Sequence, residues 1–152
     1  MQQAQNIKVY LDTCCVNRLF DVQTQDRVQR ETQTIKEILN YFLTMRCHWL
    51  SSEILEDEVS ADPDPERRAQ ARAVMEHVHQ TCSVGVNEQT RGEELELLGF
   101  KRFDALHIAC AESGGADILL TTDDRMLRLA KRYQSHLRVR IENPHTWLQE
   151  IT

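Results

Sequence analysis

Aspartates follow two apolar runs of the sequence. "IKVYL", from Ile7 to Leu11, leads directly to Asp12, and the run from Ile118 to Leu120 leads through two threonines to Asp123 and Asp124. Short apolar runs of this kind, bounded by turn signals, predict buried β-strands. Asp123 or Asp124 could simply be the N-cap of the helix that begins just after them, because aspartate is common in that position. On this stretch alone, capping is the favoured interpretation.

A third acid changes that interpretation. Asp104 stands at the start of the helical stretch "RFDALHIACAES", which runs toward the strand at 118–120. Because the carboxyl ends of parallel strands meet at one edge of a sheet, we expect Asp12, Asp104 and Asp123 to converge. A cluster of unpaired carboxylates is electrostatically costly, and no lysine stands at these strand ends. The pattern therefore predicts a divalent cation with hard oxygen ligands, Mg²⁺ or Mn²⁺.

Strand-like and helix-like segments alternate along the whole chain, which predicts right-handed βαβ crossovers. The predicted strands are residues 7–11, 47–52, 82–86, 118–120 and 139–141. The predicted helices are residues 30–45, 53–60, 65 to about 79, 91 to about 99, 102–113, the basic segment after Asp124, and a last short helix from Pro144. We therefore expect an α/β fold: a three-layer α/β/α sandwich with a mostly parallel sheet of about five strands, with residues 1–152 as a single domain.

Composition limits the class of protein. No apolar segment approaches the length of a membrane span, and "MQQAQNIKVYLD" lacks the features of a signal peptide, so we expect a cytoplasmic protein. Five cysteines without a C-x-x-C pair or Cys/His ligand spacing predict reduced thiols rather than disulfides or a zinc site. The net charge of −6 argues against a broad nucleic-acid surface, although local basic clusters can still bind phosphate.

Four segments together resemble a known family. "VYLDTCCVNRLFD", "SSEILEDEV", "RFDALHIACAE" and "LLTTDDRML" are similar to the signature segments of the PIN-domain nucleases, in the same order. The resemblance implies a PIN-like fold and a metal-dependent ribonuclease whose hydrolysis leaves a 5′-phosphate. Small prokaryotic members are largely toxins of VapC type, so it also implies an RNA substrate, a cognate antitoxin protein as possible partner, and a possible homodimer.

The resemblance assigns site residues by position. Asp12, Asp104 and Asp123 match the first, third and fourth acids of the family and are the implied metal ligands. The second acid matches Glu58, which completes the implied catalytic set. Its register stays open because other acids crowd the same helix, namely Glu53, Glu56 and Asp57.

Polar and basic neighbours suggest supporting roles. Thr13 and Thr122 could hydrogen-bond a ligating carboxylate or a metal-bound water, and Asn17 could meet a phosphate or a carboxylate. A basic face, formed by Arg125, Arg128 and Arg132, is either solvated or bound to the RNA backbone. Asp124 is interpreted as a cap or surface acid.

Other interpretations remain. His107, which shares a helical face with Asp104, is interpreted as structural rather than as a metal ligand. The acids are also compatible with a non-catalytic PIN-like module that binds RNA or protein, and a housekeeping RNA-processing nuclease is open. A phospho-acceptor domain ranks last because the chain lacks an acidic pair after the first strand and a lysine after the last. The segment 21–31 lengthens the entry into the first long helix and could shape an antitoxin groove, an RNA channel or a dimer contact.

Overall fold

A parallel β-sheet forms the centre of the computed structural model, which describes residues 6–152. The strands lie in the order β3-β2-β1-β4-β5, and all four neighbouring pairs are parallel. The chain builds outward from β1 twice, so the strand order switches direction between β1 and β4. The strands are β1 (Ile7–Leu11), β2 (Cys47–Ser52), β3 (Gln80–Cys82), β4 (Ile118–Leu120) and β5 (Arg140–Glu142).

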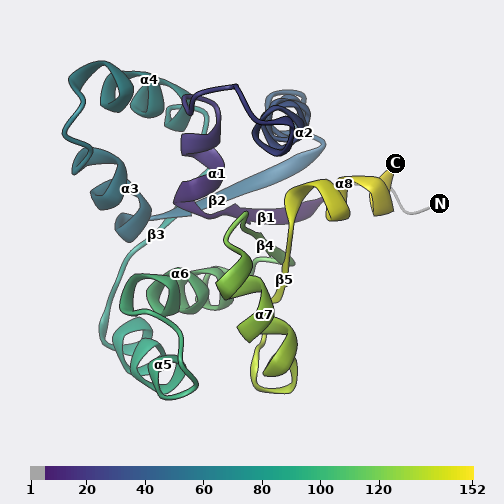
Figure 1. Cartoon of the computed structure of the whole chain (residues 1–152). Coiled ribbons are helices and arrows are strands. Elements are labelled where there is room, and N and C mark those ends of the chain that lie inside the picture. Colours follow the sequence, from purple (N-terminus) through teal and green to yellow (C-terminus); the bar gives the residue numbers. More distant parts are fainter. Residues whose placement is uncertain (1–5) are drawn as a thin grey trace.

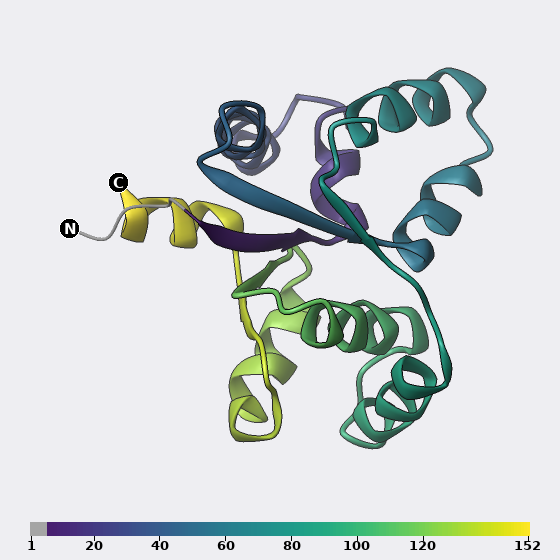
Figure 2. The same ribbon diagram turned by 180° about the vertical axis from the view of Figure 1, so that it is seen from behind.

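Helices cover both faces of this sheet. One side carries α1 (Thr13–Arg18), α2 (Asp26–Leu43), α3 (Glu53–Ser60) and α4 (Pro65–Met75) (Figure 1). The other side carries α5 (Val86–Leu97), α6 (Arg102–Ser113) and α7 (Asp124–Arg132), as the reverse view also shows (Figure 2). A 3₁₀ turn, η1 (Gln134–His136), leads to β5, and α8 (Pro144–Ile151) packs against α2. The predicted three-layer α/β/α fold is confirmed.

The helices of the described part of the chain were compared with the length and hydrophobicity of a membrane span. Between residues 6 and 152, no helix has both the length and the apolar character required to cross a bilayer.

Polar residues begin the helices where the sequence predicted them. Ser52 caps α3 by accepting a hydrogen bond from the Leu55 amide at 3.2 Å. Pro65 and Pro144 open α4 and α8, where proline's missing N–H removes no intrahelical bond. Each proline follows a residue whose side chain accepts from the helix's first amides, Asp64 and Asn143 respectively.

The core lies where the two faces of the sheet meet the helices. The last three residues of β1 and all three of β4 are buried, as expected for parallel strands covered on both faces. On one side, the apolar face of α2 packs on the sheet, and Phe42 stacks on Trp49 with ring centroids 4.9 Å apart. Ile35 and Ile38 are buried on that face as predicted, whereas Leu43 at its end is 57% exposed.

Several predicted boundaries are wrong, and hydrogen bonds explain the largest shift. The strand predicted at 82–86 is instead β3 at Gln80–Cys82, and the helix predicted from Arg91 begins at Val86. The Gly85 amide donates to the Glu88 carboxylate at 2.8 Å, a capping interaction that starts α5 five residues early.

Smaller shifts affect three other elements. The helix predicted at 30–45 is α2 at Asp26–Leu43. Its start was predicted too late because the first turn of α2 is polar and shows little apolar periodicity. The helix predicted to reach about residue 79 ends at Met75, and the strand predicted at 139–141 is β5 at Arg140–Glu142.

Gly114 ends α6 where the chain passes close to β2. A Cβ at this position would lie 2.5 Å from Leu50 Cδ2 and 3.1 Å from the Cys110 carbonyl oxygen. We predict that Gly114→Ala lowers the free energy of unfolding by about 1–3 kcal/mol because it overpacks the core. Urea unfolding followed by circular dichroism measures this. The neighbouring exposed-site variant Ser113→Ala serves as the control, and an equal effect in both variants would contradict the steric explanation.

Candidate functional site

The predicted acids come from four separate elements and meet beyond the carboxyl ends of β1 and β4. Asp12 follows β1, and its amide donates to the Leu120 carbonyl at the end of β4 at 2.9 Å. Asp123 is the third residue after β4, Asp104 lies in the first turn of α6, and Glu58 lies on α3. This edge coincides with the switch in strand order, where open α/β sheets place their ligand sites.

Asp12 is the most firmly held of these acids. It is 5% exposed and caps α1, with Oδ1 accepting from the Thr13 amide at 2.8 Å. Oδ2 accepts from the Thr121 hydroxyl at 2.8 Å and from the Cys14 thiol at 3.3 Å. The carboxylate therefore cannot rotate without breaking contacts to both β4 and α1.

Glu58 is the acid of α3 that faces the site. Its Oε1 accepts from the Thr13 hydroxyl at 2.9 Å and contacts Nε2 of His107, while Oε2 has no hydrogen-bond partner among residues 6–152. Burial acts to raise the pKa of Glu58, but the hydrogen bond and charge of His107 outweigh it and lower that pKa. Glu53 instead accepts from the Val84 amide.

The remaining two acids of this helix, Glu56 and Asp57, are exposed. The structure thus places Glu58, and not its crowding neighbours, beside the other site groups.

Asp104 has an unusual electrostatic environment. Its carboxylate makes no hydrogen bond or ion pair with the described residues. Burial, and after it the negative charges of Asp12 and Asp123, together raise the pKa of Asp104 to about 6. A carboxylate whose charged form is opposed in this way lies in a site that would be stabilised by added positive charge.

Asp123 combines both roles that the sequence allowed. Its Oδ1 caps α7 by accepting from the Arg125 amide at 2.9 Å and the Met126 amide at 3.2 Å. Its Oδ2 has no hydrogen-bond partner in the described chain. Capping therefore does not prevent Asp123 from offering an oxygen to the site.

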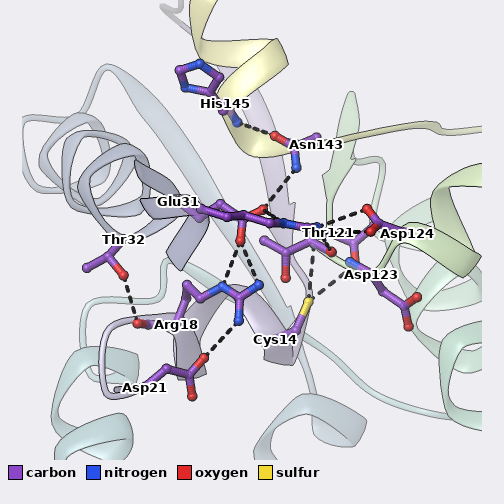
Figure 3. Close-up of polar contacts among 12 residues, drawn as sticks. Cys14, Arg18, Asp21, Glu31, Thr32, Thr121, Asp123, Asp124, Asn143 and His145 are labelled. Atoms are coloured by element: carbon purple, nitrogen blue, oxygen red, sulfur yellow. Dashed lines mark hydrogen bonds and ion pairs between the residues drawn. The ribbon is translucent and has the colours of Figure 1, made fainter. Parts of the chain in front are cut away.

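An ion network centred on the buried Glu31 anchors the loop that carries Asp123. Glu31 of α2 is 3% exposed and lies between Arg18 and Arg27, at 2.6 and 3.3 Å. Arg27 also donates to both oxygens of Asp124 and to the Thr122 carbonyl at 2.9 Å. Figure 3 shows how this network joins α1 and α2 to the loop after β4 and to the start of α8. Asp124 is thus a paired surface acid, close to the interpretation drawn from the sequence.

Three predicted supporting residues take different positions. Thr13 contacts a site carboxylate as predicted, but it is Thr121, not Thr122, whose hydroxyl reaches Asp12. The Thr122 and Asn17 side chains form no hydrogen bonds with the described residues. Thr122 therefore stays a predicted supporting residue, and the hydrogen bond to Asp12 comes from its neighbour Thr121.

Other groups at the site had weak sequence signals. Tyr10 and Thr121 lie within predicted apolar or polar runs and showed no ligand spacing. Arg27 lies far along the chain from the loop that it binds. His107 was noted for its D-x-x-H spacing, and the structure places it against Glu58, with Nε2 3.6 Å from Asp12 Oδ1.

The predicted basic face divides into three different environments. Arg125 donates to the Gly99 carbonyl at 2.9 Å, and Arg132 stacks over the Tyr133 ring at 5.3 Å. Arg128 makes no ion pair within the described chain and lines a groove of about 710 Å³ between α7 and β5.

The donor chemistry fits a hard divalent cation. All four acids offer oxygen ligands, and the nearest arginines are engaged elsewhere. Among residues 6–152, no three His, Cys, Asp or Glu side chains already stand in an arrangement that encloses one ion. Mg²⁺ is usually held by one or two carboxylates and several waters, so an open site with Asp104, Asp123 Oδ2 and Glu58 Oε2 suits it.

Comparison with known proteins identifies related chains. The family model described as "PIN domain" matches residues 9–132. No curated protein sequence is significantly similar to the chain.

Solved structures of VapC-type proteins share the fold. VapBC2 from Rickettsia felis, bound to a DNA fragment from its promoter, has a TM-score of 0.61 at 14% identity, covering 90% of this chain and 98% of that one. DNA-bound VapBC from Salmonella typhimurium has a TM-score of 0.59 at 15% identity, covering 91% and 98%. Mycobacterium tuberculosis VapC20, a sarcin-ricin loop cleaving toxin, has a TM-score of 0.58 at 14% identity, covering 79% and 93%.

The raised pKa of Asp104 implies that the stability of the folded protein depends on pH. The pKa of Asp104 is higher in the folded protein than in the unfolded chain, so the free energy of unfolding falls as pH rises from about 4 to about 6. Above pH 6 this loss of stability is complete. In EDTA, we predict that Asp104→Asn is more stable than the parent at pH 7.5 by about 1–2 kcal/mol, discounted for partial exposure, and equally stable near pH 4.

Urea titrations at the two pH values measure the difference. Glu93→Gln, an exposed acid on α5, is the control and should show no such pH dependence. A less stable Asp104→Asn at pH 7.5 would show that the acids do not repel one another.

Proposed function

Because the chain belongs to the PIN domain family, we propose that it is a divalent-metal-dependent ribonuclease that hydrolyses RNA phosphodiester bonds. The metal ligands in this proposal are Asp12, Asp104 and Asp123, with Glu58 as the fourth acid and Mg²⁺ or Mn²⁺ as the ion. The observation that carries the proposal is the opposed ionisation of Asp104 beside Asp12 and Asp123. Like charges held together by a rigid sheet edge favour a cation there.

The reaction is hydrolysis of a phosphodiester. Divalent ions in such sites lower the pKa of a bound water and neutralise charge that builds on the phosphate oxygens. Water adds to phosphorus, and the bond between phosphorus and the 3′ oxygen of one nucleoside breaks. The products in this proposal are one fragment with a 5′-phosphate and one with a 3′-hydroxyl.

The chain's own residues orient the acids for this step. Thr121 and the Thr13 amide fix the Asp12 carboxylate, and the Thr13 hydroxyl helps to fix Glu58. Asp104 must release its proton before it can ligate a cation, so we expect the apparent Mn²⁺ affinity to rise with pH up to about 6, the pKa of Asp104 in the metal-free protein.

The partners in the proposal follow from the related structures. Two of the similar structures are VapBC complexes, and a third is a toxin that cleaves the sarcin-ricin loop. These likenesses support a role as the toxin of a toxin-antitoxin pair acting in the cytoplasm, with a cognate antitoxin as partner and a possible homodimer. Asn17 stays a proposed contact for phosphate or a carboxylate, and Thr122 stays a proposed supporting residue.

The RNA backbone is proposed to lie in the groove between α7 and β5. Besides Arg128, the groove is lined by Lys131 and Arg138, and the side chains of all three make no ion pair within the described residues. Arg140, also on the groove, is paired with Glu142 and Glu150. The groove begins on the helix that follows Asp123 directly, so an RNA strand bound there would continue from the acids. Arg125 and Arg132 remain secondary candidates.

Asparagine variants test catalysis without removing the caps. Asp12 and Asp123 are both N-caps, and asparagine caps helices equally well, so Asp12→Asn and Asp123→Asn should fold. We predict that each lowers cleavage of a mixed pool of structured RNAs in Mg²⁺ or Mn²⁺ by at least about 100-fold. Gel analysis of cleavage, with EDTA as a metal-free arm, measures this.

Asp64→Asn is the matched control, because it changes an exposed aspartate that caps α4 and is not one of the site acids. It should retain activity. Full activity in Asp12→Asn would contradict the assignment of Asp12 as a metal-binding catalytic acid. RNA binding without cleavage by the parent protein would favour a non-catalytic module.

Charge reversal tests the groove. In the Asp104→Asn background, we predict that Arg128→Glu with Lys131→Glu weakens RNA binding at least about 10-fold at 0.1 M salt. The slope of log K against log salt should become shallower by at least about 1.4, the value for two lost contacts to single-stranded RNA. Fluorescence anisotropy measures both. Arg30→Glu with Lys36→Glu, two exposed cations on α2, is the control; an equal loss there would mean that binding follows net charge only.

A further inference from the structure

A buried histidine connects the protein core to Glu58. His107 on α6 is 1% exposed, and both of its ring nitrogens have partners. Nδ1 lies 2.6 Å from the Tyr10 hydroxyl, and Nε2 contacts Glu58 Oε1. Because a carboxylate only accepts hydrogen bonds, Nε2 carries the hydrogen in this contact.

Tyr10 continues the chain of hydrogen bonds on the other side of the imidazole. It is fully buried in β1, and its hydroxyl lies 2.6 Å from Ser52 Oγ. Ser52 in turn accepts from the Leu55 amide as the cap of α3, the helix that carries Glu58. The polar contacts therefore form a closed circuit: they start at the first turn of α3, pass through β1 and α6, and return to α3 at Glu58.

Donors and acceptors match along this circuit. The Ser52 hydroxyl can donate to Tyr10, and the Tyr10 hydroxyl can donate to Nδ1 of His107. With Nδ1 accepting, the neutral imidazole must carry its hydrogen on Nε2, so Tyr10 selects the tautomer that donates to Glu58. Burial lowers the pKa of His107, but the hydrogen bond to Glu58 and the charge of Asp12 outweigh it and raise that pKa, and the imidazolium form also carries a hydrogen on Nε2. A partner that fixes one ring nitrogen is how proteins orient the other nitrogen of a histidine.

Glu58 needs this support because its side chain is long and 30% exposed. The two groups that hold it, His107 and Thr13, both contact Oε1 and leave Oε2 without a partner among the described residues. We propose that His107, oriented by Tyr10, is a positioning residue that holds Glu58 by one oxygen so that the other is available to the acid site. This inference rests on the proposed function for its catalytic consequence, but not for the contact itself.

The contact can be tested in the metal-free protein by NMR of the imidazole nitrogens. His107 should be a donor at Nε2, and Glu58→Gln should shift the Nε2 resonance. Glu56→Gln, which changes an exposed acid on the same helix, should not shift it. A neutral imidazole protonated on Nδ1, or a resonance insensitive to Glu58→Gln, would overturn the proposal whether or not the protein is a nuclease.

Two amide substitutions separate positioning from folding. The amide nitrogen of His107→Gln can take the place of Nε2 and reach Glu58, whereas that of His107→Asn lies nearer to Nδ1 and reaches only Tyr10. We predict that His107→Asn lowers kcat and apparent Mn²⁺ affinity by about 10- to 100-fold, the range for removing a ligand's support, and that His107→Gln restores most of both. Calorimetric Mn²⁺ titration gives the affinity independently of cleavage.

A double-mutant cycle completes the test. In the Glu58→Gln background, His107→Asn should cause no further loss, because its effect acts through Glu58. If the activity losses of the two single variants multiply in the double variant, His107 does not act through Glu58. If activity instead falls in proportion to the stability in urea, and does so equally in His107→Asn and His107→Gln, His107 only stabilises the fold. If the NMR result holds but the parent protein binds no Mn²⁺ and cleaves no RNA, the proposed function fails while the contact stands.

Discussion

Like-charge repulsion at the carboxyl ends of β1 and β4 is the constraint on which the site depends. The parallel sheet switches direction between these two strands, so the residues that follow them are neighbours regardless of their separation in sequence. Burial of Asp104, together with the nearby negative charges of Asp12 and Asp123, raises its pKa and so opposes its ionisation. A fold rarely keeps such an arrangement for its own stability, because unpaired carboxylates favour a more open state. The repulsion therefore supports the proposal that a cation binds at this edge of the sheet.

The surrounding structure resists that repulsion by holding three of the four acids with hydrogen bonds. Asp12 is held by both of its oxygens, Asp123 by the first turn of α7, and Glu58 by His107 and Thr13. The Arg18–Glu31–Arg27 network then ties the loop after β4 to α1 and α2. These contacts use one oxygen of Asp123 and one of Glu58 and leave the other oxygen of each without a partner among the described residues.

Much of this arrangement could be predicted from the sequence because it follows from local patterns. Apolar runs that end in acids indicated β1 and β4, and the alternation of elements indicated the parallel sheet, whose order then brings Asp12 and Asp123 together. Contacts that depend on packing could not be predicted in this way. Arg27 meets the loop after β4 only because α2 crosses the sheet beside it, and Thr121 rather than Thr122 faces Asp12 because of the phase of one extended segment. The early start of α5 depends on a single glycine-to-glutamate capping contact, which outweighs the strand-like alternation of Val84 and Val86.

The measurement that tests the central claim most directly is an anomalous-difference map, recorded at the manganese absorption edge from crystals grown with Mn²⁺. The account predicts a peak at the carboxyl ends of β1 and β4, about 2–2.5 Å from oxygens of Asp12, Asp104 or Asp123. This peak should be absent from crystals of the Asp104→Asn variant. Manganese bound only elsewhere on the molecule, or no peak at this edge of the sheet at saturating Mn²⁺, would contradict the claim that these acids form a metal centre.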